Sequence, residues 1–213
     1  MKICLLGAPG CGKGTQAKLI SEKFGYPHIS TGQLFRDAIA NDTPMGREVR
    51  KYMSKLVPEE IVVKLLLERL GQDDCKEGFI LDGYPRTISQ AELFDKVSGF
   101  DVVIYFNIDL DLTLDRINNR RVCTKCGETL TLDQVKDGKC SKCGGDAIVR
   151  EEDQKAQERI ETYVEHTHPL VEYYQKHNIL KTINLDKYKN LDYENGRVAV
   201  FKEVNEILEG LKC

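Results

Sequence analysis

The stretch "LLGAPGCGKGT", residues 5–15, decides the fold, because four glycines and a lysine directly follow an apolar run. The run before it has the length of a buried strand, and "KGTQAKLISEKF", residues 13–24, has the pattern of a helix. At such a junction, glycines allow backbone N–H groups to converge on one anion, since no Cβ intrudes, and the helix N-terminus adds its positive end. The stretch therefore predicts a phosphate-binding loop.

The pattern Gly-x-x-x-x-Gly-Lys, from Gly7 to Lys13, is that of a P-loop. Lys13 supplies a positive charge that can follow a β- or γ-phosphate. The usual Ser or Thr directly after the lysine is replaced by Gly14, so the motif does not assign a hydroxyl to Mg²⁺. The flanking strand and helix distinguish the loop from a chance glycine-rich turn. The residues expected to meet the phosphates of a nucleotide here are Gly10, Cys11, Gly12, Lys13, Gly14 and Thr15.

Strand-length apolar runs alternate with helical patterns along the 213 residues. The runs at 2–7, 78–83, 102–108 and 180–185 are almost continuously hydrophobic, as are strands of a parallel sheet that is covered on both faces. Helices are predicted at 13–24, at 31–41 with Thr31 as the cap, and at 58–70 with Pro58 in the first turn. The alternation predicts a doubly wound α/β fold.

Charge and hydropathy exclude several classes of function. A net charge of −3 argues against a polyanion-binding surface. We find no apolar stretch that approaches the roughly 18 residues of a membrane span. Met1 and Lys2 lead directly into a strand pattern, so we expect no signal peptide. We therefore expect a cytoplasmic protein that binds neither membrane nor nucleic acid.

Two Cys-x-x-Cys pairs lie in residues 122–149, where glycines, lysines and threonines replace the apolar periodicity. The segment is predicted to be a small inserted module. Two such pairs can present four thiolates in the tetrahedral set that Zn²⁺ favours at about 2.3 Å. A closed four-sulfur shell leaves no position for water, so we assign the metal a structural role. The predicted ligands are Cys123, Cys126, Cys140 and Cys143.

The other four cysteines, Cys4, Cys11, Cys75 and Cys213, stand alone in the sequence. Paired metal ligands and isolated thiols are typical of a reducing compartment rather than of a disulfide framework.

Five motifs resemble those of adenylate kinases in their order and spacing, and together they span most of the chain. The insert further resembles the zinc-containing lid of long-form adenylate kinases. The motifs are "GAPGCGKGT" (7–15), "STGQLFR" (30–36), "LDGYPRTISQ" (81–90), "DRINNRR" (115–121) and "HPLVEYY" (168–174).

The resemblance implies the fold of P-loop nucleoside monophosphate kinases and the reversible transfer of a phosphoryl group from MgATP to AMP, which yields two ADP. It implies Mg²⁺ with ATP, structural Zn²⁺, and a monomer. It also implies three parts: a core of residues 1–29, 60–121 and 151–213, an AMP-binding segment of residues 30–59, and a lid of residues 122–150.

The resemblance also implies an acceptor pocket. A side-chain amide such as that of Gln90 can donate and accept at once, which suits the adenine edge, whereas uridylate/cytidylate kinases are expected to carry Asn at this step. The implied AMP contacts are Thr31, Gly32, Arg36, Lys55, Leu56, Val57, Gly83, Tyr84, Pro85, Arg86, Gln90, Arg150 and Arg159.

Phosphoryl transfer joins two polyanions, and guanidinium groups match phosphate oxygens bidentately without losing their charge. No general base is expected, because the AMP phosphate is already an anionic nucleophile. The resemblance implies that the catalytic residues are Lys13, Arg86, Arg120, Arg150 and Arg159, and that Arg116, Arg120, Thr129 and Leu130 contact ATP.

The segment between Arg150 and Arg159 is about two residues shorter than the family pattern, and Glu152–Asp153 replaces the usual Asp pair.

Asp82 ends a buried strand beside the loop, where a carboxylate either orients Mg²⁺ through water or caps the next turn. The tail, residues 183–201, departs from a shorter family pattern and leaves the contacts to the ATP base unassigned.

Two other functions fit parts of the sequence. A uridylate/cytidylate kinase would share the motifs, and its acceptor preference would distinguish it. A nucleic-acid-linked P-loop ATPase could use the cysteine module as a zinc ribbon with lysines at 125, 136, 139 and 142. That module also carries acids at 128, 133, 137 and 146 and lacks aromatic residues for base stacking.

Overall fold

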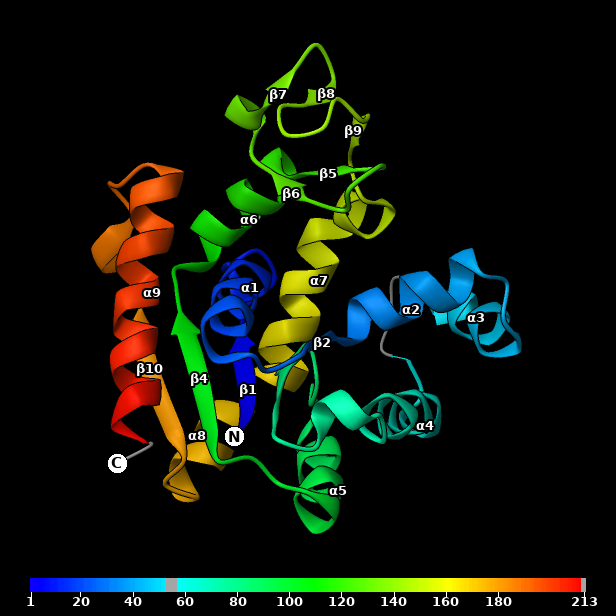
Figure 1. Cartoon of the computed structure of the whole chain (residues 1–213), viewed down its shortest axis with the longest axis vertical. Coiled ribbons are helices and arrows are strands. Elements are labelled where there is room, and N and C mark those ends of the chain that lie inside the picture. The colour runs from blue at the N-terminus through cyan, green and yellow to red at the C-terminus, as the bar shows by residue number, and fades with distance from the viewer. Residues whose placement is uncertain (53–56, 212–213) are drawn as a thin grey trace.

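The protein is described here from a computed structural model, which covers residues 1–52 and 57–211. Within these residues, five strands form a parallel sheet in the order β10-β4-β1-β3-β2 (Figure 1). This arrangement confirms the doubly wound α/β prediction and all four predicted strands. The sequence pattern missed β2, whose three residues are too few to show a period. The strands are β1 Lys2–Gly7, β2 His28–Ser30, β3 Phe79–Asp82, β4 Val102–Asn107 and β10 Leu180–Asn184.

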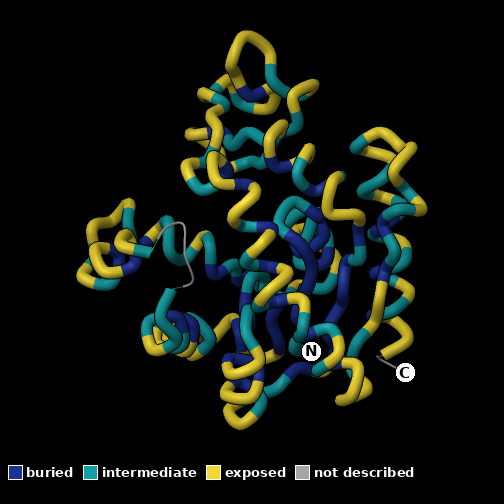
Figure 2. The backbone as a smooth tube through the Cα atoms, turned by 180° about the vertical axis from the view of Figure 1, so that it is seen from behind, coloured by how far each residue is buried: buried dark blue, intermediate teal, exposed yellow. Residues whose placement is uncertain are grey.

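Helices cover both faces of the sheet, and alternate residues of β1 pack against the helices of opposite faces. Ile3 and Leu5 pack with apolar residues of α1 and α9, whereas Cys4 and Leu6 pack with α4, α5 and α8. The resulting core runs along the strands in the middle of the molecule (Figure 2). The helices are α1 Lys13–Phe24, α2 Thr31–Ala40, α3 Pro44–Val49, α4 Glu59–Leu70, α5 Ile88–Val97, α6 Leu110–Asn119, α7 Ala156–Thr162, α8 Leu170–Lys176 and α9 Tyr193–Gly210.

Short helical turns connect several of these elements. In the part of the chain that the structure covers, they are η1 Arg50–Tyr52, η2 Asp73–Cys75, η3 Leu132–Gln134, η4 Glu151–Lys155, η6 Leu185–Tyr188 and the π-helical turn η5 Tyr163–Thr167. None of the helices in residues 1–52 and 57–211 combines the length and the hydrophobicity needed to cross a bilayer.

The cysteine-bearing insert folds into small antiparallel sheets, which lie at the top of Figure 1. A cluster of Cys123, Leu130 and Cys140 forms its centre. The segment was predicted to be a small inserted module from residue 122, and its first strand already begins at Arg121. The strands are β5 Arg121–Cys123, β6 Thr129–Leu130, β7 Val135–Lys136, β8 Lys139–Cys140 and β9 Ala147–Ile148.

The start of α2 differs from the prediction that Thr31 is its cap. Ser30 caps the helix, and its hydroxyl accepts from the backbone N–H of Gln33 at 3.4 Å. Ser30 is the last residue of β2 and keeps an extended backbone, so strand and helix join without a loop. Thr31 is therefore the first helical residue and is free to turn its hydroxyl toward the carbonyl of Gly83, 2.9 Å away.

The packing of α3 on α2 depends on Gly46. A Cβ at this position would overlap the backbone carbonyl of Ala38. We expect Gly46→Ala to lower the free energy of unfolding by about 1–3 kcal/mol, since backbone at the contact has to shift. Gly196→Ala is the matched control, because its Cβ would meet Leu191 Cβ at an ordinary 3.8 Å in α9, and it should raise stability by about 0.5–1 kcal/mol. Urea unfolding of both variants checks this; equal effects of the two would contradict it.

Candidate active site and metal centre

The P-loop joins β1 to α1 as the sequence predicted. Gly10 and Gly12 have φ angles of 84° and 103°, in the left-handed region that favours glycine. A Cβ at Gly10 would lie 2.9 Å from Cγ1 of Ile117, so the loop packs closely against α6. Lys13 bends back over the loop, and its Nζ donates to the carbonyls of Gly7 at 2.8 Å and Ala8 at 2.9 Å. The ammonium group thus lies over the loop that leads into the N-terminus of α1.

The Asp82 carboxylate lies beside the first turn of α1. Its Oδ2 is 3.5 Å from Nε2 of His28 and would be 3.7 Å from a Cβ on Gly14. Burial raises the pKa of Asp82, but the nearby His28 and the charge of Lys13 outweigh that effect, so the pKa lies below its usual value. Asp82 is therefore an ionised oxygen ligand next to the phosphate-binding loop, which fits the oxygen chemistry of hydrated Mg²⁺.

A small pocket lies on the β3–β2 side of the loop and has one apolar wall. Thr31 Oγ1 and Arg86 Nε both donate to the carbonyl of Gly83 at 2.9 Å, so one backbone group holds two of the polar side chains of the pocket. Phe35 and Val62 were not predicted as site residues, because on their helices they look like ordinary core positions. The pocket is lined by Thr31, Phe35, Val57, Val62, Gly83, Arg86 and Gln90.

Gln90 is buried in the first turn of α5, with 5% of its surface exposed. Its Oε1 accepts from the backbone N–H of Arg86 at 2.8 Å, and Thr87 caps the helix. The amide was expected both to donate and to accept at a base edge. Since its oxygen already binds the backbone, the NH₂ group is the part of the amide best placed to read a ligand.

Other predicted acceptor residues support the pocket rather than line it. Tyr84 points into the core, where its hydroxyl donates to the carbonyl of Gln90 at 3.2 Å, and Pro85 follows it through a cis peptide bond. A Cβ on Gly32 would lie 3.4 Å from Nη1 of Arg36, so Arg36 folds over the first turn of α2. Lys55 and Leu56 lie outside the described residues.

Arginines from distant motifs gather around two acids of η4. Asp153 accepts from Arg120 Nε at 2.9 Å and Nη2 at 2.5 Å, and the same carboxylate binds Arg159. Its neighbour Glu152 accepts from Arg36 at 2.8 Å. The sequence indicated that this acidic pair replaces an Asp pair, but it did not show which arginines the acids hold.

The arginine cluster carries buried positive charge. Burial, together with the charges of Arg120 and Arg36, lowers the pKa of Arg150 to about 10, so Arg150 remains charged at neutral pH. Burial also lowers the pKa values of Arg86 and Arg159. Arg150 Nη2 donates to Thr129 at 2.8 Å, while its buried Nε has no hydrogen-bond partner within the described residues. Because desolvated like charges repel one another, the cluster is suited to a polyanion.

Two of the residues predicted to contact ATP, Arg116 and Leu130, are not part of the arginine cluster described above. Arg116 is exposed at the last turn of α6, and the side chain of Leu130 is buried in the centre of the insert. The structure therefore does not join Arg116 or Leu130 to the arginine cluster, whereas it does join Thr129 to it.

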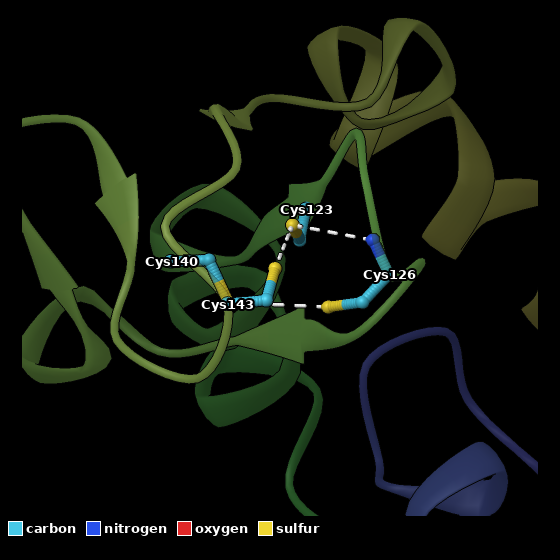
Figure 3. A group of neighbouring side chains, drawn as sticks. All are labelled: Cys123, Cys126, Cys140 and Cys143. Atoms are coloured by element: carbon cyan, nitrogen blue, oxygen red, sulfur yellow. Dashed lines mark hydrogen bonds between the residues drawn. The ribbon is translucent and has the colours of Figure 1, made fainter.

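The four cysteines of the insert form a compact cluster that could hold a metal ion (Figure 3). Their Sγ atoms all lie within 4.8 Å of one another, with 3.4 Å between Cys123 and Cys143 and 4.0 Å between Cys126 and Cys140. A tetrahedron with Zn–S bonds of about 2.3 Å places its sulfur atoms about 3.8 Å apart, so the donor set fits Zn²⁺. The backbone N–H groups of Cys126 and Lys125 lower the pKa of Cys123 to about 6, which favours the thiolate that a metal binds.

A P-loop on a doubly wound sheet, an acceptor pocket beside it and a cluster of phosphate-matching arginines define a nucleoside monophosphate kinase. The family model for adenylate kinase matches residues 5–179. The chain is 46% identical to an adenylate kinase of Clostridium tetani over 92% of this chain and 96% of the relative. It is also 41% identical to an adenylate kinase of a Geobacillus species over the full length of both, and 42% identical to one of Archaeoglobus fulgidus over the full length of both. The chain belongs to the adenylate kinase family.

Gln90→Leu tests base recognition in the acceptor pocket. It leaves polar atoms of adenine unpaired, so we expect AMP use to weaken by about 1–3 kcal/mol while the KM for ATP stays nearly unchanged. Use of UMP should weaken less. Steady-state kinetics with AMP and UMP check this, with Gln175→Leu on the exposed face of α8 as the control. An unchanged AMP-to-UMP preference would remove Gln90 from base recognition.

Cys140→Ser tests the metal centre. Mutation of a residue that only hydrogen-bonds to a metal ligand already lowers metal affinity about 10- to 100-fold. Loss of a ligand itself should therefore lower zinc affinity by at least about tenfold. The melting temperature should fall, because metal binding is coupled to the folding of the insert. Metal analysis and thermal melts check this, with Cys75→Ser, a cysteine outside the cluster, as the control. A variant that keeps full zinc content and stability would contradict the assignment.

Proposed function

We propose that this chain performs the reversible transfer of a phosphoryl group from MgATP to AMP with the residues assembled between its P-loop and its acceptor pocket. The observation that supports the proposal most directly is the arginine cluster, in which the guanidinium groups of Arg36, Arg120 and Arg159 bind the same two acids. Arg150, from the other end of the insert, is close enough for the charges of these groups to affect its pKa. Membership of the adenylate kinase family supports the same reaction.

The donor phosphates lie along the P-loop in this proposal, where the first amides of α1 and Nζ of Lys13 meet their oxygens. Lys13 exchanges its bonds to the carbonyls of Gly7 and Ala8 for bonds to phosphate. A flexible ammonium group can follow the phosphoryl group as it moves. Residues 10–15 thus bind the donor, as the motif predicts.

The acceptor phosphate faces Arg36, Arg86 and Arg159 in this arrangement. Asp153 occupies only some of the N–H donors of Arg120 and Arg159 and fixes the planes of both groups, which leaves the other donors for phosphate oxygens. Positioning and charge stabilisation supply the catalysis, because the AMP phosphate needs no base to become a nucleophile.

Two metals fit the residues present. Mg²⁺ accompanies ATP in adenylate kinases, and Asp82 would hold its water shell beside the loop, where the ion supplies charge neutralisation at the phosphates. Zn²⁺ fits the four sulfur atoms of the insert, and with no open coordination position its role there is structural.

We further propose the three-part division into the core, the AMP-binding segment of residues 30–59 and the lid of residues 122–150. The insert supports this division, because it has its own sheets and its own apolar cluster. We also propose a cytoplasmic monomer that acts on free nucleotides; the cysteine usage and the family resemblance support this proposal.

Formation of ATP and AMP from ADP alone, with Mg²⁺ and no second substrate, tests the reaction class. A nucleic-acid-linked ATPase cannot carry it out. A comparison of AMP, UMP and CMP as acceptors then separates an adenylate kinase from a uridylate/cytidylate kinase. No conversion of ADP would contradict the proposed function.

Lys13→Met tests the role of the loop lysine in this assay. The substitution keeps bulk and removes the charge, so we expect turnover to fall at least about a hundredfold, which is the scale of losing one electrostatic stabiliser. Lys18→Met is the control on the same helix, since that lysine binds Glu128 of the insert at its exposed surface, and it should stay within about twofold of the parent. A folded Lys13→Met protein with near-parent turnover would contradict the assignment.

A further inference from the structure

The π-helical turn Tyr163–Thr167 interrupts the helical run between α7 and α8. The N–H of His168 donates to the carbonyl of Tyr163 at 2.8 Å, so this turn contains one residue more than an α-helical turn. Such single turns occur frequently at functional sites, because the extra residue changes the direction of the side chains after it. Here the last residue of the turn, Thr167, faces the backbone of Arg86.

Thr167 binds Arg86 from the side opposite Gln90. Its Oγ1 donates to the carbonyl of Arg86 at 3.0 Å, and only 9% of Thr167 is exposed. The N–H of Arg86 in turn donates to Oε1 of Gln90 at 2.8 Å. Arg86 lies between β3 and α5, where neither a sheet nor a helix fixes its backbone. Both of its backbone polar groups are held by side chains instead.

Arg86 needs such an anchor because burial disfavours the charge of its guanidinium, which lies in the same cluster as Arg159. The charge of Arg86 contributes to lowering the pKa of Arg159. Arg159 is held by the Asp153 carboxylate, whereas Nε of Arg86 is bound to a neutral carbonyl, that of Gly83. The charges of Asp82 and Glu152 favour the ionised form of Arg86. The hydrogen bonds described for Arg86 go to neutral groups, so its position depends on its backbone.

The anchor and Arg159 belong to one continuous helical run. Arg159 lies in α7, and Thr167 ends the π-helical turn that directly follows α7. The hydroxyl therefore ties the loop that carries Arg86 to the element that carries Arg159, although residues 86 and 167 are 81 positions apart.

We propose that Thr167 is a positioning residue that sets Arg86 against Arg159 for the acceptor phosphate. This inference rests on the proposed function, since it assigns both arginines to the phosphate of AMP. Thr167 itself touches no substrate. Its effect should appear in the use of the acceptor and not in the binding of the donor at the P-loop.

The test compares Thr167→Val, which removes the hydroxyl and keeps the shape, with Thr167→Ser, which keeps the hydroxyl. Because small misplacements of a catalytic group have large costs, we expect Thr167→Val to lower kcat/KM for AMP on the order of tenfold. The KM for ATP should stay within about twofold, and so should all parameters of Thr167→Ser. If Thr167→Val does not fold, Thr167→Ala removes the same hydroxyl and takes its place with the same expected loss.

Thr162→Val is the matched control, because Thr162 ends α7 and its hydroxyl also donates to a carbonyl, that of Glu158 at 2.8 Å, but on the exposed surface. We expect its kinetics to match the parent. The background Arg86→Lys then separates positioning of Arg86 from a general loss of structure. In that background, the removal of the hydroxyl of Thr167 should cost much less than tenfold, since the guanidinium that it positions is gone.

Three results would overturn the inference. The first is a Thr167→Val protein with parent kcat/KM for AMP. The second is a Thr167→Ser protein as impaired as Thr167→Val, which would assign the effect to packing. The third is an equal loss in the parent and Arg86→Lys backgrounds. Failure of the parent to convert ADP into ATP and AMP would instead contradict the proposed function itself.

Discussion

The buried carboxylate of Asp153 is the interaction on which the arrangement of the site depends. Its side chain is fully shielded from solvent, and it binds Arg120 from the end of α6 and Arg159 from α7. A buried ion pair adds little net stability, but removal of one partner leaves an uncompensated charge at a large cost. Asp153 therefore fixes the geometry of two guanidinium groups more than it stabilises the fold. Ile117 of α6 packs in one apolar cluster with Ala156 and Ile160 of α7, and this cluster holds the two helices together.

The sequence alone predicted those parts of the fold and the site that depend on a local residue pattern or on the spacing of a motif. Four of the five strands of the large sheet were predictable from their apolar runs, whereas β2 is too short to show a pattern. The P-loop was predictable because its backbone favours glycine. The zinc cluster followed from the spacing of its four cysteines. The pairing of Asp153 with Arg120 was not predictable, because it joins residues 33 positions apart through a packing that no local pattern records.

Other parts of the site look ordinary in sequence. Phe35 and Val62 sit at helix positions that any core residue could occupy, and only the fold turns them toward the acceptor pocket. The Ser30–Thr31 pair offers two hydroxyls to the same helix start, and tertiary structure selects Ser30 as the cap. Thr167 carries no signal in the sequence, because its effect depends on one π-helical turn that aims its hydroxyl at Arg86.

The cysteine cluster and the arginine cluster are connected through the strands of the insert. Arg120 directly precedes β5, and Arg150 follows two residues after β9. These two strands pair with Val122 opposite Ile148 and Cys123 opposite Ala147, so the register of one ladder places both arginines. Exposed ion pairs such as that of Lys18 with Glu128 contribute little stability to this arrangement of the insert. Cys123 is both a member of the ladder and a predicted zinc ligand. Metal bound by the four sulfur atoms would therefore fix the register, and through it the separation of Arg120 and Arg150, without contacting a phosphate.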